Sequence, residues 1–236
     1  MFGFLKHKKT LENYGLLNGA TDNHSHILWG LDDGVKTQEE TLSILSFLAS
    51  LGLKTLWLTP HTMEDVPNTT EGLKARFEEL LGIYDGPIEL RLASEYMIDT
   101  LFEKRLEERD LLTHGRDTVL VETSTWAPPI DLWDILERMM SYGYRPMIAH
   151  PERYRYMTMK DYKRLKEMGT VLQLNLPSIL GSYGEGPRLK AQMLLEKGFY
   201  TMVGSDCHRS HAIKRQYTDV KLKESTLERL KELMLA

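Results

Sequence analysis

The chain has 236 residues, of which 42% are hydrophobic and 27% are charged, so it can bury a substantial core and does not have the composition of a disordered protein. Its formal net charge of −4 at pH 7 lacks the positive excess of nucleic-acid-binding domains, so we expect no nucleic-acid partner and disfavour a nuclease. The single cysteine, Cys207, excludes an intramolecular disulfide and a cysteine-rich zinc site, and it best fits a reducing cytoplasm.

Residues 1–19 are expected to form an N-terminal tail. The largely apolar segment Met1–Leu5 precedes the basic segment Lys6–Lys9, which reverses the order of a signal peptide, and the apolar run is too short to span a membrane. A basic and apolar tail could touch a membrane surface or a partner, but a frayed terminus is the simpler expectation. We therefore predict a cytoplasmic protein.

Short β-rich segments alternate with longer helical patterns along the rest of the chain. Strands are expected at residues 20–26, 55–59, 88–92, 118–122, 146–150, 171–175 and 200–204. Helices are expected at residues 38–50, 70–84, 100–108, 131–142, 160–168, 187–197 and 224–235. This order is typical of parallel strands joined by crossover helices, without an internal linker. We interpret residues 20–236 as one α/β domain, whose strand–helix units could form either a distorted barrel or an open doubly wound sheet.

Almost every predicted strand ends in a side chain that can bind a metal ion. These side chains are His24, His26, His61, Glu95, Glu122, His150, Asp206 and His208. In a β/α barrel the carboxyl ends of all strands surround one mouth, so residues far apart in the sequence would converge there. A lone histidine or carboxylate at a strand end is usually structural. Such a coincidence at six successive strand ends favours a metal site.

The spacing within two motifs supports this interpretation. Because a strand has a period of two, His24 and His26 should face the same side, and so should Asp206 and His208. Cys207 should then point away and pack. By contrast, His7, His114 and His211 follow no strand end and are expected to be surface or local capping residues. Tyr154 and Tyr156 could either line a cleft or cover the start of a helix.

Four segments resemble a known family. Residues 24–28 (HSHIL), 32–34 (DDG), 149–154 (AHPERY) and 204–208 (GSDCH) are similar to motifs of the polymerase and histidinol phosphatase (PHP) superfamily. Within it, they most resemble the bacterial capsule-type tyrosine phosphatases. The matching motifs extend from about Asp22 to His208. The resemblance implies a distorted (β/α)7 TIM-like barrel of the PHP type.

The resemblance also implies three metal ions. One ion would take His24, His26 and Asp206, with Glu95 bridging to a second ion. The second would add Glu122 and His150, and the third would take Asp33, His61 and His208. Asp33 matches the ligand position, but the adjacent Asp32 is an alternative.

Phosphate contacts are implied less completely. Arg153 matches a phosphate-contacting arginine of the family, although a salt bridge to neighbouring Glu152 is the structural alternative. A later arginine has no clean counterpart, which leaves Arg209, Lys214 and Arg215 as candidates. We expect Arg153, Glu95, Asp206 and His208 to act in catalysis.

Imidazole and carboxylate ligands without thiolate suit manganese, iron or zinc, and we predict two to three such ions. Clustered divalent ions activate water for in-line displacement on phosphorus. The sequence has no Cys-x5-Arg phosphate loop, which argues against a cysteine-based phosphatase. Aryl phosphates should be the easier substrates, because phenolate is a better leaving group than an alkoxide.

The predicted function is a protein-tyrosine phosphatase. The resemblance alone implies its partner, a membrane-associated bacterial tyrosine kinase that regulates capsule or exopolysaccharide synthesis. The alternatives are a small-molecule phosphatase of the histidinol phosphate type, a DNA exonuclease, and a module that binds phosphotyrosine without hydrolysing it.

Overall fold

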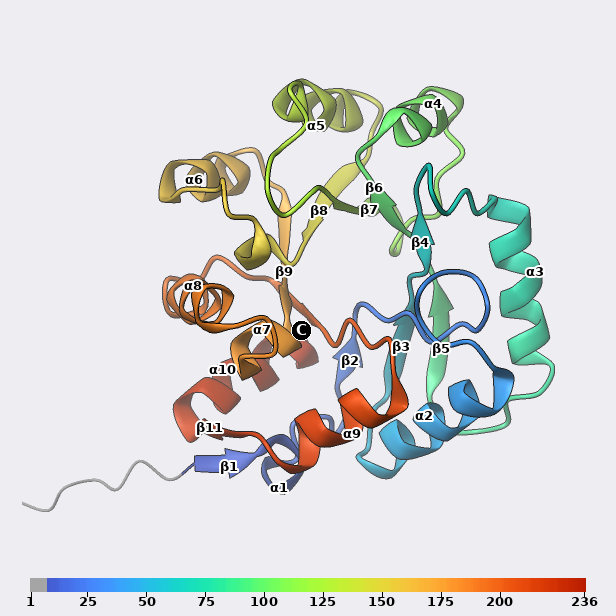
Figure 1. The fold of residues 1–236 in the computed structure, drawn as a ribbon, viewed down its shortest axis with the longest axis vertical. Coiled ribbons are helices and arrows are strands. Elements are labelled where there is room, and N and C mark those ends of the chain that lie inside the picture. Colours follow the sequence, from blue (N-terminus) through green and yellow to red (C-terminus); the bar gives the residue numbers. More distant parts are fainter. Residues whose placement is uncertain (1–7) are drawn as a thin grey trace, which may run out of the picture.

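The strands of two parallel sheets lie at the centre of the molecule and helices surround them (Figure 1). The computed structural model describes residues 8–236. One parallel sheet contains β4 (His61–Thr62), β6 (Glu95–Met97), β7 (Thr118–Glu122), β8 (Arg145–Ala149), β9 (Val171–Asn175) and β10 (Met202–Gly204), in the order β10-β9-β8-β7-β6-β4. A second parallel sheet contains β2 (Thr21–Asp22), β3 (Thr55–Leu58) and β5 (Glu89–Leu92), in the order β2-β3-β5.

Two expected strands continue beyond their predicted ends as second, separate pieces. β3 pairs with β5, and β4, which follows β3 after Thr59 and Pro60, pairs with β6. Proline cannot donate a ladder hydrogen bond, which accounts for the interruption at Pro60. The second pieces carry His61 and Glu95 into direct register with each other.

Hydrogen bonds also connect the two sheets between the segment after β2 and the segment after β10. Asp206 N donates to His24 O at 2.8 Å, and His26 N donates to Cys207 O at 2.9 Å. Ser25 and Cys207 form a parallel β-bridge. The parallel sheet is therefore curled, and the predicted α/β class is confirmed in this form. Its central strands β7 and β9 are buried along their whole length, as expected where both faces are covered.

The expected helices are all present. They are α2 (Gln38–Ser50), α3 (Thr70–Leu81), α4 (Thr100–Glu108), α5 (Leu132–Ser141), α6 (Met159–Glu167), α8 (Glu185–Glu196) and α10 (Glu224–Leu235). Of these, α2, α4 and α10 have the predicted ends, and the other four have shifted ends. Thr37, Thr69 and Asp99 cap α2, α3 and α4 by accepting backbone N–H bonds. Three further helical segments were not predicted: η1 (Pro151–Arg153), α7 (Leu176–Leu180) and α9 (Ser210–Thr218).

The N-terminal region differs from the predicted tail. β1 (Lys8–Thr10) pairs antiparallel with β11 (Lys221–Lys223), and α1 (Leu11–Tyr14) follows it. Leu11, Leu16 and Leu17 are buried in the main core, so residues 8–19 pack onto the domain. The expected frayed residues 1–7, including His7, lie outside the described residues. Between residues 8 and 236, the helices are all too short or too polar to cross a bilayer.

Candidate metal centre

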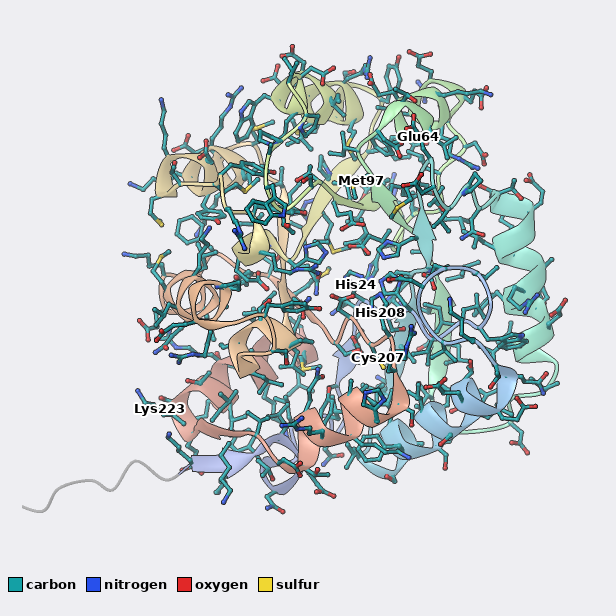
Figure 2. All side chains as sticks on the ribbon, in the orientation of Figure 1. His24, Glu64, Met97, Cys207, His208 and Lys223 are labelled. Carbon is teal, nitrogen blue, oxygen red and sulfur yellow. The ribbon has the colours of Figure 1, made fainter. Side chains whose placement is uncertain are left out.

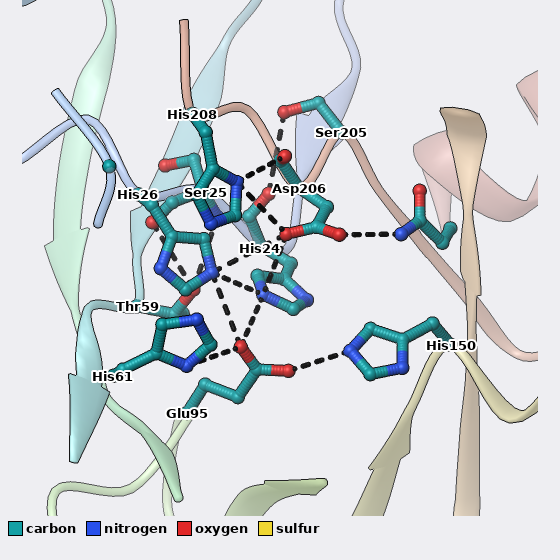
Figure 3. A network of polar contacts seen from close by, with 12 residues as sticks. His24, Ser25, His26, Thr59, His61, Glu95, His150, Ser205, Asp206 and His208 are labelled. Carbon is teal, nitrogen blue, oxygen red and sulfur yellow. Dashed lines mark hydrogen bonds and ion pairs between the residues drawn. The ribbon is translucent and has the colours of Figure 1, made fainter. Parts of the chain in front are cut away.

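The nine predicted metal ligands converge at the carboxyl ends of the strands. Figure 3 shows His24, His26, His61, Glu95, His150, Asp206 and His208 pointing toward one another. Three groups have ligand atoms within 4.8 Å of one another. They are His24, His26 and Asp206; His61, Glu95 and Glu122; and His26, Asp33, His61 and His208. His150 joins them because its Nε2 lies 3.0 Å from Glu95 Oε1 and 3.5 Å from Glu122 Oε2. His26 and His61 each belong to two groups, so the groups overlap.

His24 and His26 face each other across the first group. Their Nε2 atoms are 2.9 Å apart, and each lies within 3.2 Å of Glu95 Oε2 and within 3.6 Å of Asp206 Oδ1. Both imidazoles are fully buried. The two rings come from the segment after β2, where alternation along the chain places them on one side of the backbone, as the sequence predicted.

Two residues behind these rings determine which nitrogen faces the centre. Gln173 Oε1 lies 3.1 Å from His24 Nδ1, and Asp32 Oδ2 lies 2.7 Å from His26 Nδ1. An amide or carboxylate oxygen can only accept, so Nδ1 donates in both rings and a neutral ring leaves its Nε2 lone pair directed at the centre. Histidines that bind metals are typically supported in this way.

The structure also distinguishes the adjacent aspartates. Asp33 Oδ1 lies 3.3 Å from His208 Nε2 and 3.6 Å from His61 Nε2, within one ligand group. Asp32 instead accepts hydrogen bonds from His26 Nδ1 and from the backbone N–H groups of Gly34 and His61. Burial opposes ionisation of Asp32, but these bonds outweigh it and lower its pKa to about 2.

Glu95 lies at the middle of the cluster. Its Oε2 is 3.1–3.2 Å from nitrogens of His24, His26 and His61, while its Oε1 meets His150. The side chain is fully buried, which favours the neutral acid, but the charges of His24 and His61 hold its pKa well below the usual value. A carboxylate in this position can bridge two cations.

The polar atoms of the cluster are suited to binding cations. His61 Nδ1 is buried and makes no hydrogen bond, although Glu95 Oε2 lies 3.1 Å and Glu122 Oε1 3.2 Å away. Burial lowers the pKa of His24 and of His61, but the surrounding carboxylates raise these values to about 9 and about 10. Four carboxylates gathered here require positive charge nearby, which either imidazolium groups or metal ions can provide.

Backbone strain is concentrated at two of the ligands. His150 has φ of 36° and Asp206 has φ of 50°, a left-handed conformation that is uncommon outside glycine. Such conformations cost on the order of 1–3 kcal/mol each and are found preferentially at functional sites. At both positions the chain turns sharply at the end of a strand, which directs the side chain toward the centre.

A cavity of about 810 Å³ opens over the cluster. Arg153 lines it, with Nη1 3.3 Å from Asp206 Oδ2 and its guanidinium 4.4 Å from the centre of the Tyr183 ring. Glu152 does not pair with Arg153, because it accepts bonds from Tyr200 OH and from Asn175 N. The alternative role of Arg153 as a partner of Glu152 is therefore wrong.

The other basic candidates differ in position. Arg209 and Arg215 both line the cavity, whereas Lys214 lies over the ring of Phe47. The Arg209 guanidinium donates to backbone carbonyls of Asp33 at 2.6 Å and His208 at 2.8 Å, and also to that of Gly34. Arg209 thus links the segment of Asp33 to the segment of His208 through hydrogen bonds.

Several residues outside the ligand set are now placed. Cys207 packs in the core as predicted, and burial raises the pKa of its thiol. Tyr154 is buried behind His150, with ring centres 5.7 Å apart, and Tyr156 stacks on it. His211 is exposed and lines the cavity from α9.

The expectation that His114 is a surface or local capping residue is wrong. Its ring is buried and stacks on Trp57 at 3.7 Å, because its backbone pairs with Thr118 at the start of β7. Sequence reasoning also missed Gln173 and Tyr183, since neither belongs to a ligand motif. Only the position of Gln173 on a predicted strand suggested that it could face the centre.

Comparisons with known proteins agree with this geometry. Residues 20–226 match the family model described as "Capsular polysaccharide synthesis, CpsB/CapC". Tyrosine-protein phosphatase CpsB of Streptococcus agalactiae serotype V is 28% identical over 207 residues, which cover 79% of this chain and 82% of that protein. Tyrosine-protein phosphatase CpsB of Streptococcus pneumoniae is 26% identical over 231 residues, covering 91% and 94%.

A solved structure shows a similar fold. It comes from a study of YwqE from Bacillus subtilis and CpsB from Streptococcus pneumoniae, described as "unique metal-dependent tyrosine phosphatases". The TM-score is 0.72 at 24% identity, and the match covers 91% of this chain and 94% of the other.

Proposed function

The chain belongs to the capsular polysaccharide synthesis CpsB/CapC family, and we propose that it is a metal-dependent protein-tyrosine phosphatase. The observation that carries this proposal is the convergence of five imidazoles and four carboxylates beneath a cavity that also presents Arg153. The curled sheet and the hydrogen bonds between its edges support a distorted (β/α)7 barrel of the PHP type.

We propose the following ligand sets for two to three divalent ions. His24, His26 and Asp206 would hold one ion, Glu95 would bridge to a second held with Glu122 and His150, and Asp33, His61 and His208 would hold a third. The ligand chemistry suits manganese, iron or zinc. When bound, such ions would activate water and neutralise charge on phosphate.

The chain's own residues would position the phosphate. The guanidinium of Arg153 can donate paired hydrogen bonds to two phosphate oxygens, and Asp206 and Tyr183 hold it at the cavity wall. Arg209 and Arg215 line the same cavity and could contribute the second phosphate contact. Because Cys207 packs in the core with a raised thiol pKa, it is a poor nucleophile.

We further propose that the substrate is a phosphotyrosine protein, by analogy with the named phosphatases of the family. The most suitable partner is a membrane-associated tyrosine kinase that controls capsule or exopolysaccharide synthesis. Action in the cytoplasm stays a prediction. The second candidate, a small-molecule phosphatase of the histidinol phosphate type, would use the same ligands.

A metal analysis combined with a substrate comparison tests the proposal. The purified protein should contain about two to three transition-metal ions per chain and hydrolyse a phosphotyrosine peptide faster than the matched phosphoserine peptide or an alkyl phosphate. Chelation should abolish turnover, and manganese, iron or zinc should restore part of it. Full turnover by metal-free protein would reject the metal-dependent mechanism, whereas preference for alkyl phosphates would favour the second candidate.

A further inference from the structure

A second pocket, of about 210 Å³, lies where the β1–β11 ribbon meets α8. We define it as the basic pocket because the charged side chains that line it, among the described residues, are Lys8, Arg188, Lys221 and Lys223. Arg188 is already paired with Glu185 at 3.4 Å, so the three lysines supply the positive charge of the pocket for a ligand. The whole chain carries a formal net charge of −4, so this positive charge is not a property of the composition. Figure 2 shows Lys223 at the edge of the molecule, on a different side of α9 from His208.

The register of the ribbon adds to this concentration. The antiparallel pairing of β1 and β11 places Lys8 directly opposite Lys223. Like charges in directly opposed positions destabilise a strand pair. An anion bound in the basic pocket would reduce this repulsion.

The basic pocket lies beside the cavity that opens over the metal cluster. Leu180 and Val220 line both of them, one at the end of α7 and the other between α9 and β11. An extended peptide lying over these two apolar side chains would reach from the metal centre to the lysines. A strand advances roughly 3.3 Å per residue, so a segment of several residues would be needed to connect two such pockets.

We infer that the basic pocket binds acidic side chains of the substrate segment that flanks the phosphotyrosine. This inference rests on the proposed phosphatase function and adds a preference for sequence around the target. Charge complementarity favours carboxylates, and the apolar connection through Leu180 and Val220 favours a peptide over a small free anion. Exposed ion pairs contribute little individually, so each lysine should change affinity by only about 1.5- to 5-fold.

The test compares a double variant, Lys221→Gln with Lys223→Gln, with a matched control, Lys54→Gln with Lys74→Gln. The control removes the same charge at two exposed lysines that line neither pocket. Three substrates are used: a phosphotyrosine peptide flanked by glutamates, the same peptide with glutamines, and p-nitrophenyl phosphate. The double variant should raise KM for the glutamate peptide about 2- to 25-fold and leave KM for the other two substrates unchanged, and the effect should disappear at high salt.

Equal losses on both peptides, or no loss on the glutamate peptide, would overturn the inference. If the wild-type protein hydrolyses none of the three substrates, the proposed phosphatase function fails instead. In that case fluorescence anisotropy of the labelled glutamate and glutamine peptides still shows whether the basic pocket binds acidic side chains. The wild-type protein and the Lys54/Lys74 control should prefer the glutamate peptide, and the Lys221/Lys223 variant should not.

Discussion

The hydrogen bonds around Asp32 make a sharp prediction about metal affinity. All three of its described partners are donors: His26 Nδ1 at 2.7 Å, Gly34 N at 2.8 Å and His61 N at 2.9 Å. In Asp32→Asn one oxygen becomes an NH₂ group, which cannot accept. If the NH₂ group takes the place of Oδ1, the Gly34 N–H loses its acceptor. If it takes the place of Oδ2, the His61 N–H loses its acceptor, and His26 either loses its acceptor or adopts the tautomer that carries its proton on Nε2, toward the centre.

The size of the expected loss in metal affinity follows from the hydrogen bond to Asp32 that is lost. A hydrogen bond to a charged group contributes about 1.5–3 kcal/mol, which corresponds to about a 10- to 150-fold change in an equilibrium constant. This agrees with the roughly 10- to 100-fold loss of metal affinity typical when a group supporting a ligand is removed. We therefore expect Asp32→Asn to fold, to bind metal about 10- to 100-fold more weakly, and to recover much of its kcat when metal is saturating.

The assay titrates metal into chelator-treated protein and measures bound metal and aryl phosphate turnover in parallel. Asp65→Asn is the control, because it removes the same charge at an exposed position outside the cavity. A folded Asp32→Asn protein with wild-type metal affinity would refute the role of Asp32 in orienting His26. An unrecoverable kcat at saturating metal would mean that Asp32 itself acts in the reaction.

Three further predictions concern the centre and its surroundings. Glu95→Gln should lower kcat at least about a hundredfold, because the bridging charge is lost; near-normal turnover in steady-state kinetics would contradict bridging. Arg153→Ala should keep its metals and lose about 10- to 1000-fold in kcat/KM, and Arg153→Lys should recover part of that loss. Metal analysis and kinetics on the same samples check this, and loss of metal from Arg153→Ala would show that phosphate binding and metal binding are not separate. Burial, with nearby positive charge, lowers the pKa of His114 to about 3, so the folded state binds its proton less readily than the unfolded state. The free energy of unfolding should therefore fall as pH drops from about 6.5 toward 3, by up to about 1.4 kcal/mol per pH unit. Chemical denaturation of His114→Phe across that range should show a shallower fall, and an unchanged slope would contradict the lowered pKa of His114.

The sequence predicted the convergence of ligands because the rule behind it is general. Parallel strands joined by crossover helices bring their carboxyl ends together, so His24, Glu122 and His150 could be placed at one site without coordinates. The alternation of side chains along a strand paired His24 with His26 in the same way. Caps at Thr37, Thr69 and Asp99 explain why several helix starts were also predictable.

Other features depend on contacts that no local pattern encodes. Gln173 and Asp32 support His24 and His26 through tertiary hydrogen bonds, and these partners cannot be read from the segments in which Gln173 and Asp32 lie. The β1–β11 ribbon joins short, lysine-rich segments from opposite ends of the chain, so neither has a strand pattern by itself. The N-cap residue of α9 is Arg209, which makes no side-chain cap hydrogen bond, so the usual sequence signal for a helix start is missing.

The pairing of residues 22–26 with residues 203–207 has a consequence for folding. Asp22 Oδ1 accepts from Ser205 N, 183 residues later in the sequence, so bringing these segments together costs the entropy of closing a long loop. The proposed ligands His24 and His26 lie on one side of this seam, and Asp206 and His208 lie on the other. Ions that bind only the native state stabilise that state by RT ln(1 + [L]/Kd). Metal binding should therefore stabilise this long-range contact between the two segments. Amides at the seam, such as His26 N and Asp206 N, should exchange hydrogen faster after chelation than amides in β7, and equal protection in both states would show that the seam closes independently of the ions.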